Sequence, residues 1–280
     1  MEFKTGYRTS PPNESDQSED LISSDTIYGA VVYWFYKLFP NIADDVALNL
    51  KVSSLMFRDK NEYYIPKPLI VDTFELENVK KIKKATHVKL SAVENILKNK
   101  KIDERDVANV NEFIVKHLMT RNALDRITNF SMPYFIEVVR VKPGVKPFIV
   151  VDLDSKYEKQ LISAFRMLGD SGIGSDNTYG FGIFTPNFSD IPEKLKSEDG
   201  VLHVLLSEYL PSESEFGKVL NGYYRLKRKS GIKKERMERK HEISYIVEGS
   251  VFHFKPQGRG ALKLRDFWIQ TTPLCLSVKI

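Results

Sequence analysis

The stretch that most limits how this chain can fold is Gly172–Phe184, which reads GIGSDNTYGFGIF and holds four glycines within eleven positions. Lys156–Leu168, just before it, repeats apolar residues at helical spacing. Phe181–Phe184, at its end, reads as a short strand. The sequence therefore predicts a helix, a glycine-rich loop and a strand in that order. Nucleotide-binding folds use a different order, because there a strand comes first and the loop opens a helix.

The glycines in this loop allow two interpretations. Glycine reaches positive φ and lets backbones approach closely, and successive free N–H groups can hold an anion. Glycine also ends helices in ordinary turns. The loop alone leaves both an anion-binding loop and a helix-ending turn open.

The charge balance is mildly basic, with 42 Lys and Arg against 37 Asp and Glu in 280 residues and a formal net charge of +5. Basic side chains gather between Arg225 and Lys240, and Tyr223, Tyr224 and Tyr245 flank that run. Cations that follow phosphates and rings that stack on bases are typical of sites for single-stranded nucleic acid. The alternative interpretation of the run is a solvated hairpin tip.

Several classes of protein are not predicted. Cys275 is the only cysteine, so the chain cannot form a disulfide framework or a cysteine metal site, which suits a reducing cytoplasm. The five histidines lack metal-ligand spacing, and no nucleophile or cofactor signature is present, so neither metal nor cofactor is expected. The chain has no apolar run of about 18 residues and a polar N-terminus, so neither a membrane span nor a signal peptide is predicted.

The pattern of elements predicts an α+β fold with two parts, residues 1–186 and 187–280. The elements of the first part are a helix over 27–39 ended by Pro40, strands over 134–141 and 148–153, a helix over 156–168 and a strand over 181–184. This is a ferredoxin-like order with a large insertion at about 40–133. It lacks its first strand, which only Met1–Arg8 could supply. The second part reads as a strand over 201–208, a short helix over 212–220, strands over 223–229 and 241–248, and further extended sequence.

Eight stretches fall in an order that is typical of one family: ISSDTIYGAVVYWF, VSSLMF with YYIPKP, RNALDRITN, YFIEVVRV, LGDSGIGSDNTYGFGIF, YYRLKRKSG and EGSVFHFKPQGRG. They resemble the RAMP-superfamily subunit of type III-A CRISPR complexes that holds the crRNA 5′ tag, the fourth Csm subunit. Each stretch alone has low specificity, whereas the ordered set is specific. The resemblance covers nearly the whole chain.

The resemblance implies two ferredoxin-like (RRM-like) domains with a β-hairpin thumb and a glycine-rich loop. It implies a non-catalytic subunit that binds the crRNA 5′ tag and bridges the large signalling subunit to the backbone RAMP subunits in antiviral defence. The partners it implies are crRNA and those Csm subunits, with no membrane. The RNA-binding residues that it implies are Lys67, Arg121, Asn122, Arg126, Gly172, Gly174, Asn177, Gly180, Gly182 and Arg259.

The chain departs from the family pattern at two places. The middle of the family's glycine loop usually carries Lys or Arg, whereas here it reads Ser175-Asp176-Asn177. Because Asp176 would repel phosphate, backbone amides and more distant arginines would have to attract it. Family members also usually begin with a full first strand, which here is shortened or displaced.

Two other functions remain open from the sequence. RAMP proteins include crRNA-processing endoribonucleases that use a histidine, and His117 near Arg121 could serve acid–base chemistry. The first helix, 24–39, contains no histidine that could face the glycine loop, which disfavours this alternative. The third possibility is a subunit that contacts only proteins, with a purely structural glycine loop.

Overall fold

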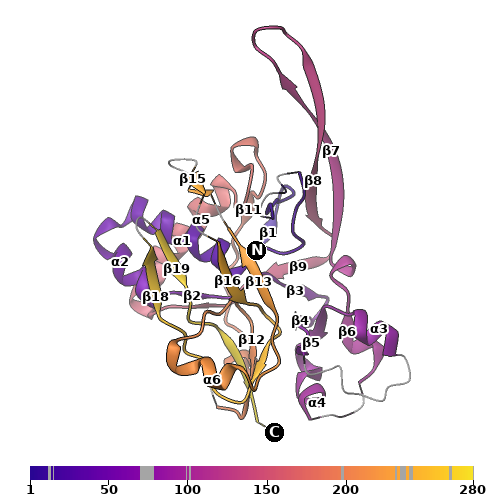
Figure 1. Cartoon of the computed structure of the whole chain (residues 1–280), viewed down its shortest axis with the longest axis vertical. Coiled ribbons are helices and arrows are strands. Elements are labelled where there is room, and N and C mark those ends of the chain that lie inside the picture. The colour runs from indigo at the N-terminus through magenta and orange to yellow at the C-terminus, as the bar shows by residue number, and fades with distance from the viewer. Residues whose placement is uncertain are drawn as a thin grey trace.

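The fold was analysed in a computed structural model of the chain (Figure 1). It describes residues 1–11, 14, 16–69, 79–98, 100, 102–196, 199–230, 232–233, 238–239, 242–264 and 267–279. Helices and antiparallel strands are mixed along the chain, so the predicted α+β class is confirmed. Within the described ranges, no helix is long and apolar enough to cross a membrane.

The main helices of the first half are α1 (Ser24–Leu38), α2 (Pro40–Asn49) and α5 (Glu158–Ser171). Helix α1 contacts both of the others and strand β19 (Phe267–Gln270). Pro40 does not simply end the helical region as predicted. It is the first residue of α2, where a proline needs no backbone N–H and its fixed φ suits the helix.

The expected missing strand is supplied by the N-terminus. Strand β1 (Glu2–Phe3) pairs antiparallel with β11 (Phe184–Thr185), directly after the glycine-rich loop. Tyr7 then bridges to Val139, and its buried ring joins the core formed with α1 and α5. The first strand is therefore short, and it lies where a ferredoxin-like order requires one.

A five-stranded antiparallel sheet follows, in the order β6-β5-β4-β3-β9. Its strands are β3 (Met56–Asp59), β4 (Glu62–Pro66), β5 (His87–Lys89), β6 (Val107–Ala108) and β9 (Val145–Phe148). Strands β3 and β4 pair as an antiparallel hairpin. The register places Phe57 opposite Tyr64, so this hairpin contributes an apolar side chain to the core.

A long hairpin projects from the body of the molecule (Figure 1). Its strands β7 (Ile114–Leu124) and β8 (Ser131–Val141) are eleven residues each and pair along their full length. We call β7, β8 and the turn between them the thumb. The strand predicted over 134–141 lies within β8.

The second half centres on β12 (Leu202–Leu205), which lies between β17 (Val251–Phe252) and β20 (Cys275–Val278). Two further hairpins of this half are β13 (Leu226–Lys229) with β16 (Ile243–Ile246), and β18 (Ala261–Leu264) with β19. The buried cluster around β12 also includes Ile82, Val88 and Ile96 from the insertion. The insertion and the second half therefore share one core.

The remaining elements are short. They are β2 (Lys51–Val52), β10 (Val151–Asp152), β14 (Ile232–Lys233), β15 (Glu238–Arg239), α3 (Val79–Lys84), α4 (Val93–Leu97), α6 (Phe216–Val219) and the 3-10 turns η2 (Leu90–Ala92), η3 (Glu104–Asp106), η4 (Val110–Glu112), η5 (Ser155–Tyr157), η6 (Asn177–Tyr179), η7 (Glu193–Lys196) and η8 (Glu213–Glu215). The predicted short helix at 212–220 is η8 followed by α6, and it begins with a capping box between Ser212 and Glu215.

Candidate nucleic-acid interface

The thumb and the glycine-rich loop, two of the regions singled out by sequence, meet in the structure. We call residues 172–183 the glycine loop. Arg121, near the end of β7, lies with its guanidinium carbon 4.1 Å from the centre of the Tyr179 ring and 5.4 Å from that of Phe181. Both rings belong to the glycine loop. The contact is a cation–π arrangement that holds a cation and an aromatic ring side by side.

A small apolar cluster fixes the loop against the thumb. Ile136 and Val138 of β8 pack with Phe181, and all three side chains are buried. Tyr179, two residues earlier, is 68% exposed. The loop is therefore anchored by one ring and presents the next ring to solvent beside Arg121.

Three of the four predicted glycines face the chain's own backbone. A Cβ on Gly172, Gly174 or Gly182 would lie 2.3, 2.2 or 2.0 Å from a backbone carbonyl oxygen, and all three have positive φ. Gly180 also has positive φ, but a Cβ there would meet nothing within 4 Å. The first three glycines are therefore needed for the loop's own packing, and Gly180 is where the loop is open to a ligand.

Several loop amides already donate within the protein. Ile173 N–H donates to Gly182 O at 3.0 Å, Ser175 N–H to Arg8 O at 2.7 Å, and Gly182 N–H to Gly6 O at 2.8 Å. The Asn177 side-chain amide donates to Gly172 O at 3.2 Å. Because these donors are used internally, a phosphate at this loop would have to be attracted chiefly by cationic side chains such as Arg121.

Asp176 does not act as an isolated negative charge. It forms an ion pair with Arg8, whose side chain is only 3% exposed and also donates from Nε to Glu137 O at 2.7 Å. Burial, and then the nearby charge of Arg121, lower the pKa of Arg8. Arg8 thus neutralises Asp176 and ties the N-terminal strand, the loop and the thumb together. The negative charge of Asp176, which was expected to repel phosphate, is therefore balanced within the protein by a distant arginine.

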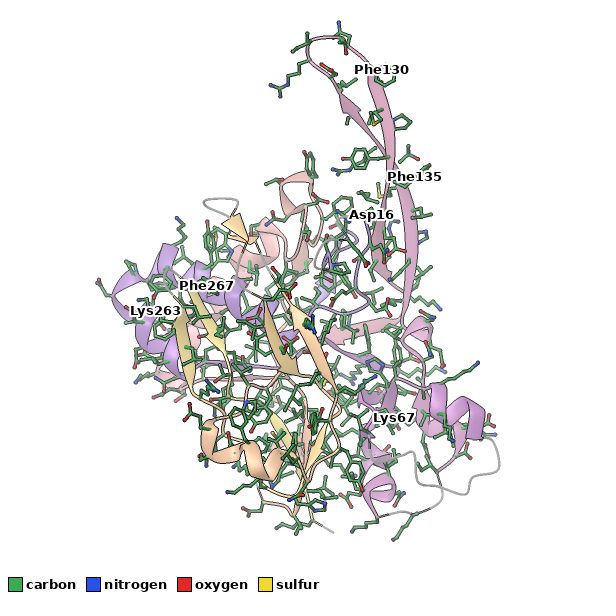
Figure 2. All side chains as sticks on the ribbon, in the orientation of Figure 1. Asp16, Lys67, Phe130, Phe135, Lys263 and Phe267 are labelled. Atoms are coloured by element: carbon green, nitrogen blue, oxygen red, sulfur yellow. The ribbon has the colours of Figure 1, made fainter. Side chains whose placement is uncertain are left out.

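The outer part of the thumb carries the other two candidates of the RNALDR segment, Asn122 and Arg126, both exposed. The Asp125 carboxylate accepts the backbone N–H groups of Ile127 and Thr128 at 2.8 and 3.2 Å, which shapes the turn. These hydrogen bonds lower the pKa of Asp125. Large apolar side chains also lie exposed along this part, and Figure 2 shows two of them, Phe130 and Phe135. Arg126 and Asn122 thus extend the candidate surface outward from Arg121.

Lys67 and Arg259 do not join this surface. Lys67 Nζ donates to Ile82 O at 2.9 Å and Lys83 O at 3.1 Å, in the last turn of α3. Figure 2 places Lys67 well below the thumb. Arg259 Nε donates to Pro211 O at 2.8 Å, beside α6. These residues were predicted together with the glycine loop because their sequence stretches belong to the same family pattern. The order of stretches along a chain does not show which of them lie close together in the fold.

The basic run at 225–240 lies partly outside the described residues. Two of its described lysines have carboxylate partners: Lys227 Nζ lies 2.6 Å from Glu19, and Lys229 Nζ lies 2.9 Å from the buried Glu208. These two lysines therefore stabilise the junction between the N-terminal segment and the second half.

The described histidines differ in environment. His87 and His203 are buried, and their Nδ1 atoms lie 2.8 Å from Thr86 Oγ1 and 2.9 Å from Ser277 Oγ. His117 is exposed on the thumb. His241 lies outside the described residues. Among the residues whose positions are described, no group of three or more His, Cys, Asp or Glu side chains could hold a metal ion.

The sequence reasoning did not single out Arg8 or Tyr179. An aromatic residue inside a glycine-rich loop was a signal for Tyr179. Arg8 could not be found in this way, because its partners Asp176 and Glu137 are more than 120 residues away in the chain.

Known proteins resemble this chain in sequence. The CRISPR system Cms protein Csm4 of Thermococcus onnurineus is 28% identical over 268 residues, which cover 88% of this chain and 86% of its own length. The protein of the same name from Methanocaldococcus jannaschii is 22% identical over 235 residues, covering 64% and 62%.

Solved structures share the fold. A chain in the crystal structure of the Csm3–Csm4 subcomplex of the type III-A CRISPR-Cas interference complex superposes with a TM-score of 0.70 at 20% identity, covering 96% of this chain and 98% of that one. A chain of the Csm1–Csm4 cassette in complex with cA4 gives 0.65 at 20% identity, covering 99% and 95%.

Two family models match the sequence. The CRISPR Csm4 C-terminal domain matches residues 198–264. The RAMP superfamily matches residues 4–185, which span the thumb and the glycine loop. This chain therefore belongs to the RAMP superfamily.

Proposed function

We propose that this protein is a non-catalytic subunit of a cytoplasmic type III-A CRISPR (Csm) ribonucleoprotein. In this role it binds the 5′ tag of the crRNA and bridges the large signalling subunit to the backbone RAMP subunits. Membership of the RAMP superfamily supports the proposal, as do relatives named Csm4 and a shared fold with chains of Csm3–Csm4 and Csm1–Csm4 assemblies.

The observation that carries the RNA-binding part is the pairing of Arg121 with Tyr179. We call these two side chains the stacking platform. An exposed ring can stack on an unpaired base, and the adjacent guanidinium can meet a phosphate. A Cβ at Gly180, the residue after Tyr179, would meet nothing within 4 Å, so there is open space beside the stacking platform.

A crRNA-processing endoribonuclease is the second candidate, and His117 is its strongest residue because it is exposed on the same strand as Arg121. A general acid or base must lie within hydrogen-bonding reach of the group it serves. His117 is four residues from Arg121, so about 13 Å separates their Cα atoms along an extended strand. Helix α1 contains no histidine that could face the glycine loop, which favours the non-catalytic proposal.

The experiment combines binding and cleavage on one RNA. Purified protein, alone and co-expressed with the other Csm subunits, is incubated with labelled repeat RNA that contains the tag. The proposal predicts saturable binding, intact RNA and recovery of the protein in one complex with both partner classes. Cleavage that is lost in His117→Ala would instead establish the endoribonuclease. Absence of RNA binding in both settings would overturn the proposal.

A further inference from the structure

The second half of the molecule carries an apolar groove that the proposed RNA site does not use. It is a hollow of about 440 Å³ between α6 and the hairpin β13–β16. The groove is defined by Phe216, Leu220, Tyr224, Leu226, Ile246 and Arg259. Figure 1 places α6 at the opposite end of the molecule from the tip of the thumb.

The apolar side chains around this groove are unusually exposed. Leu220 is 74% exposed, Leu226 64% and Phe216 48%. Isolated exposed apolar residues are common on protein surfaces, but three large ones around a single hollow mark an interaction site. Covering them would remove apolar surface from water, which is the main favourable contribution to protein association.

The groove is held in shape by hydrogen bonds beneath it. The Glu215 carboxylate accepts the Ser212 N–H at 2.9 Å, the Gln257 N–H at 2.7 Å and the Gly258 N–H at 3.1 Å. Glu215 therefore joins the start of α6 to the loop that carries Arg259. A partner would meet a preformed surface, which lowers the entropic cost of binding.

The chemistry of the groove favours a protein segment over RNA. Most of its lining is aliphatic, and the Tyr224 ring already stacks on Phe252, with ring centres 6.4 Å apart. Among its described lining residues Arg259 is the only cation. Sites for single-stranded RNA instead combine several cations with open aromatic faces. One cation at the mouth of an apolar groove is complementary to a single carboxylate on an otherwise apolar partner.

We propose that this groove docks an amphipathic segment of a partner protein. The segment inserts apolar side chains between Leu220 and Leu226 and places a carboxylate at Arg259. The inference rests on the proposed function, because it assigns to the groove one of the two protein contacts of a bridging subunit. The thumb and the groove lie far apart (Figure 1), so the groove can hold a protein segment while the glycine loop and the thumb hold RNA.

The test uses Leu220→Asp and Leu226→Asp, because both side chains are exposed and the substitutions leave the core intact. The matched control is Leu48→Asp on α2, where Leu48 is 54% exposed away from the groove. Each variant is co-expressed with the Csm subunits, and the recovery of each partner and the affinity for tag RNA are measured. Both groove variants should lose one protein partner at least tenfold and keep RNA affinity within twofold, whereas the control should keep both.

Two substitutions of Arg259 test whether its positive charge contributes to docking. Arg259→Glu should weaken capture of the same partner, and Arg259→Lys should retain part of it. Loss of RNA affinity with intact protein capture would show that the groove binds RNA and would overturn the inference. Unchanged capture of every partner in all groove variants would overturn it as well. Failure of the parent protein to bind tag RNA would contradict the proposed function alone, because partner capture is measured separately.

Discussion

At the residue scale, the site depends on two side chains whose roles are different. Arg121 and Tyr179 form a surface that a base and a phosphate can contact, whereas Arg8 holds the glycine loop in place through Asp176 and Glu137. The conformation of the loop is therefore set by a residue that precedes it by more than 160 positions.

Substitution of Tyr179, the residue proposed to contact a base, should change the affinity for tag RNA. Tyr179→Ala should weaken tag-RNA binding about 10- to 100-fold, because stacking of one base contributes roughly 1–3 kcal/mol. Tyr179→Phe should bind like the parent, since stacking needs the ring and not the hydroxyl. Fluorescence anisotropy with labelled tag RNA measures both. Equal affinity of the alanine variant and the parent would remove Tyr179 from the site.

Substitution of Arg8, which holds the glycine loop in place, should instead lower the stability of the protein. Arg8→Ala leaves the Asp176 carboxylate and Glu137 O without their donor and should lower the free energy of unfolding by about 2 kcal/mol. Lys4→Ala, at an exposed position of the same segment, is the control and should change little. Urea unfolding compares the two. If Arg8→Ala is as stable as the parent, the ion pair does not hold the loop.

These residues also indicate what sequence reasoning can reach. The glycine loop and Arg121 were found because both are compact local signals. The roles of Gly172, Gly174 and Gly182 were not predictable, because the carbonyls that exclude a Cβ there come from elsewhere in the fold or from across the loop. The Arg8–Asp176 ion pair is equally long-range. Arg259 and Lys67 were grouped with the site by family order, but their observed contacts are elsewhere.

At the element scale, the thumb is the part that the sequence described least well. Strand β7 reads IVKHLMTRNAL, in which apolar and polar residues do not alternate cleanly, and most of its side chains are exposed. Its structure comes from continuous pairing with β8, which is a long-range property. Strand β1 is similar, since two residues form a strand only because β11 offers a free edge.

The thumb should contribute to RNA affinity through charge. If Arg121 and Arg126 each neutralise one phosphate, each alanine substitution should flatten the slope of log affinity against log salt concentration by about 0.7. Lys146→Ala, on β9 outside the thumb and glycine loop, is the control and should leave the slope unchanged. Affinities measured at four salt concentrations give the slopes. A parent-like slope in Arg121→Ala would place the phosphates elsewhere.

At the scale of the whole molecule, the halves are joined by buried polar contacts as well as by a shared core. The Glu208 carboxylate meets Lys229 and accepts the Asp25 N–H at the start of α1. The Gln270 side chain bonds both the N–H and the carbonyl of Val52, at 2.9 and 3.1 Å. Such contacts join the two halves through buried polar groups.

The dependence of stability on acid pH tests how His87 is packed in the core. Burial lowers the pKa of His87 from 6.5 to about 4, so the folded imidazole stays neutral where the unfolded chain takes up a proton. The free energy of unfolding should therefore fall as the pH drops from 6.5 to 4, with a His87 contribution of up to about 3 kcal/mol. His87→Phe, in a site lined by Phe57 and Phe113, should show a shallower dependence, and the exposed His117→Ala should not. Matching pH profiles for the parent and His87→Phe would contradict this assignment.

The central claim is that RNA lies against the glycine loop and the thumb. Photo-crosslinking of tag RNA to the assembled complex, followed by mass spectrometry of the crosslinked peptides, tests it most directly. We predict crosslinks at Tyr179 and on β7 near Arg121, and their loss in Tyr179→Ala. Crosslinks on this chain that avoid both the glycine loop and the thumb would contradict the account and leave the loop with a purely structural role.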